Sequence, residues 1–134
     1  MASKALLMEH PSDPRADILE RVKAYIDHVR VTGPDVLIGV YMRPEKTAGG
    51  VWLSERAREE DIFQGKVGVV LKMGPLAFVE DGKHTFGDAV PKIGDWVVFR
   101  VSDGMSLRLG EQACRQMQDV AIRMILDGSP DIIL

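Results

Sequence analysis

The chain has 134 residues and an apolar fraction of 46%, which together allow one domain with a modest core. The net charge of -3, without a long run of one sign, argues against nucleic acid or an anionic membrane as a partner. Cys114 is the only cysteine, so an internal disulfide and a multi-cysteine zinc site are excluded, and we expect a small buried side chain. No segment has the length of a membrane span or the pattern of a signal peptide, which favours a cytoplasmic location.

The N-terminal part of the chain predicts a tail followed by an amphipathic helix. Residues 1–12 are polar and predict a poorly ordered tail. Asp13 can cap a helix whose first residue is Pro14, and Gly33-Pro34 can end it, so we expect a helix over residues 14–32. Its apolar stripe is typical of a helix packed on its own domain or docked on another subunit or partner. The residues of the stripe are Ile18, Leu19, Val22, Ile26 and Val29.

After Pro34 the chain predicts several short strands separated by turns that contain glycine and aspartate. Apolar runs rich in β-branched residues indicate strands, the first of them buried on both faces, and Ser102-Asp103-Gly104 indicates a hairpin turn. One helical turn is expected at residues 119–121. This pattern predicts a mainly β fold, a small barrel preceded by one helix. The expected strands cover residues 36–42, 66–73, 96–101, 105–109, 113–118 and 122–126.

A long, mobile loop is expected between the first two strands, at residues 44–64. Within it, a flexible pair of glycines leads directly into three large apolar residues, a pattern that suits a partner's groove better than a core. The candidate partner-binding residues are Gly49, Gly50, Val51, Trp52 and Leu53. We therefore divide the chain into the tail and helix (1–33), the barrel (34–127) and a C-terminal tail (128–134).

The sequence offers no arrangement of residues that would support an enzyme. None of the three histidines, His10, His28 and His84, has a neighbour at a metal-ligand spacing, and the serines lack the context of a nucleophile. We therefore expect no catalytic residue, no metal and no cofactor. Trp96 and Phe99 have opposite strand parity, so they cannot form one stacking platform for nucleic acid.

Several motifs in this order resemble the GroES-type co-chaperonins, and most closely the divergent members encoded by bacteriophages and prophages. The motifs are Lys46–Leu53, Gln64–Val70, Met73–Pro75, Pro91–Phe99 and Asp119–Ile125. The resemblance implies a GroES-like β-barrel that assembles into a seven-membered ring and caps a chaperonin chamber in a bacterial cytoplasm. It also implies that Val51, Trp52 and Leu53 dock between two apical helices of the chaperonin, with Gly49 and Gly50 supplying slack. The clients would include phage capsid proteins.

The chain departs from the family pattern at several points, including its docking tripeptide and its N-terminal part. The central residue of the tripeptide, usually aliphatic, is Trp52, and the helix expected over residues 14–32 has no counterpart in cellular members. An alternative function is a virion structural protein, because a barrel with a projecting arm also suits a capsid decoration or cement protein whose partners are phage capsid proteins.

Overall fold

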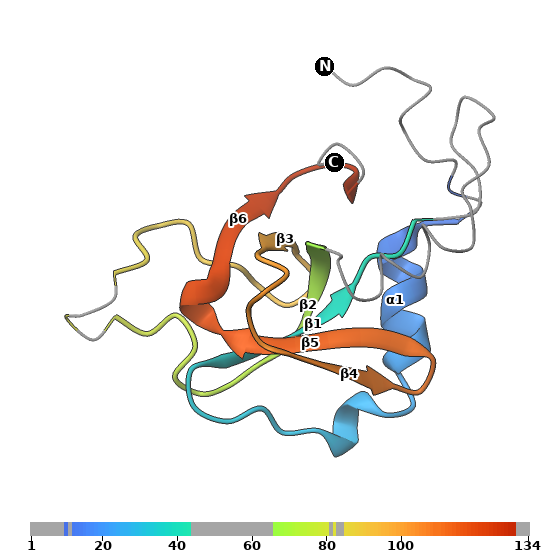
Figure 1. Ribbon diagram of the computed structural model, residues 1–134, viewed down its shortest axis with the longest axis horizontal. Coiled ribbons are helices and arrows are strands. Elements are labelled where there is room, and N and C mark those ends of the chain that lie inside the picture. The colour runs from blue at the N-terminus through green and yellow to red at the C-terminus, as the bar shows by residue number, and fades with distance from the viewer. Residues whose placement is uncertain (1–9, 11, 44–65, 81, 83–84, 131–134) are drawn as a thin grey trace.

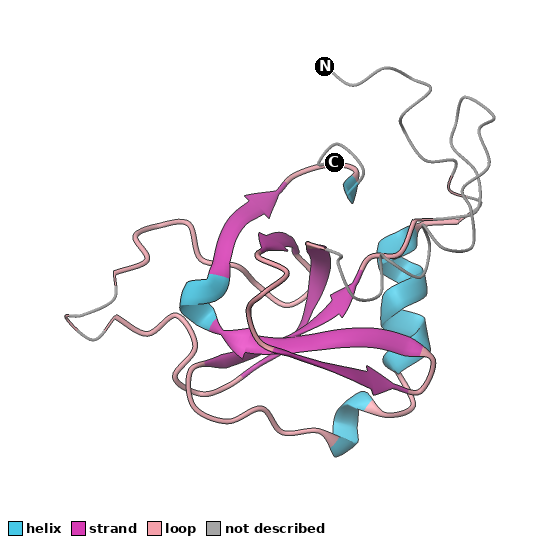
Figure 2. Cartoon of the chain, in the orientation of Figure 1, coloured by secondary structure: helices cyan, strands magenta, loops and turns pink. Residues whose placement is uncertain are grey.

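The structure is a computed structural model, and it describes residues 10, 12–43, 66–80, 82 and 85–130. Six antiparallel strands form a single curled sheet in the order β4-β5-β1-β2-β3-β6 (Figure 1). One α-helix, α1, lies beside the sheet, and the 3-10 turns η2 and η3 complete the described elements (Figure 2). The mainly β prediction is confirmed. The strands are β1 Asp35–Val40, β2 Val67–Met73, β3 Trp96–Phe99, β4 Met105–Leu109, β5 Gln112–Gln118 and β6 Ile122–Leu126.

Two clusters of apolar side chains pack against the two faces of the sheet, as strand alternation requires. In β1, Leu37 belongs to the first cluster, whereas Val36 and Ile38 belong to the second. In β3, Trp96 belongs to the first cluster and Phe99 to the second, so the two aromatic rings lie on opposite faces. Strand β1 is buried on both faces, as its continuous apolar run predicts.

Helix α1, Pro14–Val22, covers the first cluster. Its N-cap is Asp13, whose side chain accepts a hydrogen bond from the Arg15 amide at 3.1 Å. Ile18 and Val22 are each only 2% exposed and lie in the core. These two residues of the apolar stripe pack on the chain's own domain, as the first interpretation predicts, whereas Leu19 is exposed.

The helix ends about ten residues earlier than the sequence predicts. After Val22 the backbone hydrogen bonds have the 3-10 spacing, with the Tyr25 amide donating to the Val22 carbonyl at 2.9 Å, and η2 follows at Ile26–His28. The ring of Tyr25 lies over Gly110 in the turn between β4 and β5. This tertiary contact turns the chain away from the helix axis, so Ile26 and Val29 reach the first cluster without helical continuity.

The connection between β2 and β3 extends away from the sheet (Figure 1) and is held at its start by a buried carboxylate. Asp119, the first residue of η3 (Asp119–Ala121), accepts a hydrogen bond from the Phe78 amide at 2.8 Å. Phe78 has a positive φ of 59° and packs edge-on against Phe86. The helical turn expected at residues 119–121 is thus confirmed.

The strand boundaries differ from the sequence expectation by at most two residues, with the largest differences at the ends of β1 and β3. The hairpin expected at Ser102-Asp103-Gly104 is wrong, because β3 pairs with β2 and β6 and not with β4. Strand β4 pairs instead with β5, through the turn at Gly110-Glu111. Cys114 is buried in the first cluster, and this burial raises the pKa of its thiol to about 11.

Strands β1 and β2 approach each other closely where Gly39 meets Gly68. A Cβ on Gly68 would lie 2.5 Å from the Gly39 carbonyl oxygen, which is backbone and cannot rotate away. We therefore expect Gly68→Ala to lower the free energy of unfolding by about 1–3 kcal/mol, measured by urea denaturation. Ser102→Ala, at an exposed position, is the control and should change it by less than about 0.5 kcal/mol. Equal stability of the two variants would contradict this packing.

Candidate functional site

The residues singled out as the partner-binding segment, Gly49, Gly50, Val51, Trp52 and Leu53, lie outside the described residues. What the structure describes is the place where the expected loop joins the barrel. The Tyr41 amide donates to the Val67 carbonyl at 2.9 Å, and Val40 pairs with Gly68. The chain therefore enters residues 44–65 and returns from them at neighbouring points on one pair of strands. We call Gly39, Val40, Tyr41, Val67 and Gly68 the root.

An aromatic pair lies beneath the root. The ring of Tyr41, buried at the end of β1, meets the ring of Trp96 edge-on, with 5.7 Å between their centroids. The guanidinium of Arg15 lies 5.9 Å from the centroid of the Trp96 ring, within the range of a cation–π contact. His10 Nε2 is hydrogen-bonded to the Tyr41 hydroxyl at 2.7 Å. The polar hydroxyl thus has a partner where the ring is buried.

The sequence does not predict this cluster, because two of its members belong to the N-terminal part of the chain. The sequence predicts a poorly ordered tail at His10, yet its side chain contacts Tyr41, 31 positions away. No local pattern marks such a contact, since it depends on where α1 packs.

A buried glutamine connects the same helix to the last residue of β1. Gln112 is 4% exposed, and its Nε2 donates to the Val40 carbonyl at 2.9 Å and to the Ala113 carbonyl at 2.7 Å. Its Oε1 accepts a hydrogen bond from Arg21 Nη1 at 3.0 Å. Both ends of the amide are therefore satisfied, and Arg21 is linked to Val40 through one side chain.

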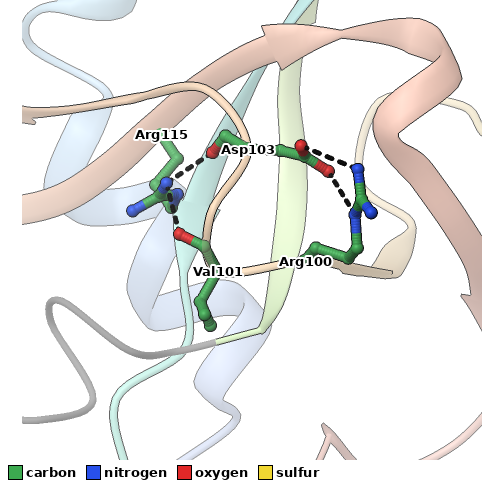
Figure 3. Close-up of polar contacts among 4 residues, drawn as sticks. All are labelled: Arg100, Val101, Asp103 and Arg115. Atoms are coloured by element: carbon green, nitrogen blue, oxygen red, sulfur yellow. Dashed lines mark hydrogen bonds and ion pairs between the residues drawn. The ribbon is translucent and has the colours of Figure 1, made fainter.

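A second polar cluster stabilises the turn between β3 and β4 (Figure 3). Arg115, on β5 and only 5% exposed, donates to the carbonyls of Val101, at 2.8 Å, and Asp103, and also to Ser106 Oγ at 3.0 Å. Its Nε has no hydrogen-bond partner within the described part of the chain. A buried guanidinium that binds backbone carbonyls holds the turn in place.

An exposed ion pair flanks this turn. Arg100 Nε and Nη2 donate to the two carboxylate oxygens of Asp103 at 3.1 and 3.2 Å. This hydrogen-bonded guanidinium lowers the pKa of the Asp103 carboxyl from its ordinary value. Because the pair is in solvent, we assign it little weight in stability.

Across the described residues, no group of three or more histidine, cysteine, aspartate or glutamate side chains could hold a metal ion. No helix among them is long and apolar enough to cross a membrane. The described geometry supplies well-packed polar contacts beneath the root.

The model of one protein family, described as the chaperonin 10 Kd subunit, matches residues 28–125. The chain belongs to this family. Members of the chaperonin 10 family are co-chaperonins, partners of a chaperonin rather than enzymes, and the expected GroES-like β fold is confirmed. The root and the whole sheet except the end of β6 lie within the match, whereas α1 precedes it.

The buried Arg115 leads to a prediction about the stability of the protein. Arg115→Met should lower the free energy of unfolding by about 2–4 kcal/mol, because the carbonyls of Val101 and Asp103 lose charge-assisted hydrogen bonds. The midpoint of urea denaturation measures the change. Arg100→Ala removes an exposed arginine from the same turn and should leave the midpoint nearly unchanged; a larger shift for Arg100→Ala than for Arg115→Met would contradict this assignment.

Proposed function

We propose that this chain is a co-chaperonin subunit that docks on the apical domains of a chaperonin through Val51, Trp52 and Leu53. Seven copies form a ring that caps the folding chamber. The observation that carries the proposal is the position of the root: a family match spans the loop, and the loop's two ends emerge side by side from paired strands. A loop attached in this way can reach a partner without disturbing the barrel. We call residues 44–65 the arm.

The energetics favour weak binding by each arm and tight binding by the ring. Burying three large apolar side chains contributes roughly 1.5–3 kcal/mol each. Ordering about ten residues of the arm costs roughly 1–2 kcal/mol per residue, a comparable total. A single arm therefore binds weakly, while a ring of arms gains affinity through effective concentration. Such a cap can still leave when the chaperonin changes its nucleotide state.

Trp52 is the anchor we assign to the centre of the docking tripeptide. A tryptophan buries more apolar surface than an aliphatic residue and dominates binding when its pocket fits. The same side chain clashes with a pocket built for a smaller residue. Trp52 would therefore select among chaperonins.

A finer expectation is that the subunit is encoded by a phage or prophage and helps capsid proteins to fold. It is supported by the resemblance of its motifs, with Trp52 and the added helix as departures from cellular members. The alternative, a virion structural protein, stays a prediction as well. Detection of the chain at a fixed, high copy number in purified particles would favour that alternative.

The docking tripeptide is tested by truncating its anchor. Trp52→Ala should abolish suppression of the ATPase of a purified bacterial chaperonin, because the largest apolar contact is lost. The size of the ring, measured by analytical ultracentrifugation, should stay the same.

Two variants serve as controls for this experiment. Trp52→Phe keeps an aromatic anchor and should retain part of the suppression. Leu76→Ala removes an apolar side chain that is 58% exposed elsewhere on the surface and should retain all of it. Full suppression by Trp52→Ala would show that the tripeptide is not the docking element.

A further inference from the structure

The N-terminal element, residues 10–22, makes four separate contacts that converge on the root or on the residues beneath it. Two are hydrogen-bonded links: His10 to the Tyr41 hydroxyl, and Arg21 through Gln112 to the Val40 carbonyl. A third is the position of Arg15 over the ring of Trp96, which itself meets Tyr41.

The fourth contact is apolar and depends on a glycine. A Cβ on Gly39 would lie 2.6 Å from Ile18 Cγ2, so Gly39 provides the space into which the helix packs. Ile18 is 2% exposed and belongs to the same core cluster as Tyr41 and Trp96. The helix therefore rests directly on the strand that leads into the arm.

These contacts come from a part of the chain that the family match leaves out, since the match begins at residue 28. The root lies within the match, whereas His10, Arg15 and Arg21 precede it. The matched barrel therefore carries the arm, and the N-terminal element restrains it.

We propose that the N-terminal element is a brace that sets the affinity of docking by fixing the root of the arm. The inference rests on the proposed function, because it concerns the same arm. A residue of Gly39–Tyr41 whose backbone is already fixed before docking loses no further conformational entropy when the arm docks. Releasing a single residue would weaken docking by about fivefold to thirtyfold per arm, the equivalent of its backbone entropy.

The test uses the full chain with the three polar contacts of the brace removed. In the variant His10→Ala/Arg15→Ala/Arg21→Ala, the core residues Ile18 and Val22 are kept, so the helix retains its apolar anchors. We expect faster amide hydrogen exchange at Gly39–Met42 and a chaperonin affinity at least fivefold lower in the presence of ATP.

A matched control removes the same kinds of side chain from the neighbouring segment. Lys23, His28 and Arg30 are exposed, so His28→Ala/Lys23→Ala/Arg30→Ala also removes one histidine and two cations. This control should leave both the exchange at Gly39–Met42 and the affinity at their original values. The free energy of unfolding, measured for both variants, separates a local effect at the root from a general loss of stability.

The outcomes distinguish the brace from the proposed function. Faster exchange with weaker docking, confined to the first variant, supports the brace. Faster exchange with unchanged affinity, or equal behaviour of the two variants, overturns it. If the unmodified chain does not bind the chaperonin, the proposed function fails, and the docking role of the brace fails with it; the exchange measurement then still shows whether the root is held.

Discussion

The burial of β1 on both faces is the constraint on which the rest of the structure depends. This strand pairs with β2 on one side and β5 on the other, and its residues from Val36 to Val40 are all buried. A strand in that position needs a cover for each face, and its end cannot shift without disturbing two neighbours. The arm that follows it therefore starts from a fixed point.

The face of β1 that belongs to the first cluster is covered by an element that is not part of the barrel. Helix α1 can approach β1 only because position 39 has no side chain, and it brings Arg15 and Arg21 to the region of the root in the same step. The packing of the helix on β1 therefore has two effects: it completes the core, and it brings two arginines close to the root. Under the proposed function, the helix would therefore serve docking as well as the core.

The sequence predicted those features that local pattern controls, and missed those that tertiary contacts control. The runs of β-branched residues at Val36–Val40 and Val67–Val70 predict buried strands, because burial on both faces requires such runs. The early end of α1 follows from Tyr25 on Gly110, and the place of His10 follows from Tyr41. The glycines before Val51 stand out by sequence pattern alone and lie outside the described residues.

The two ends of the arm lie close together, so the sequence between them can be replaced. Since Tyr41 and Val67 are joined by a backbone hydrogen bond, the barrel closes beneath the arm whatever sequence the arm contains. Doubling the length of such a loop adds only about 0.6 kcal/mol of closure entropy. Under the proposed function, replacing residues 44–65 as a cassette would therefore change the partner on an unchanged scaffold.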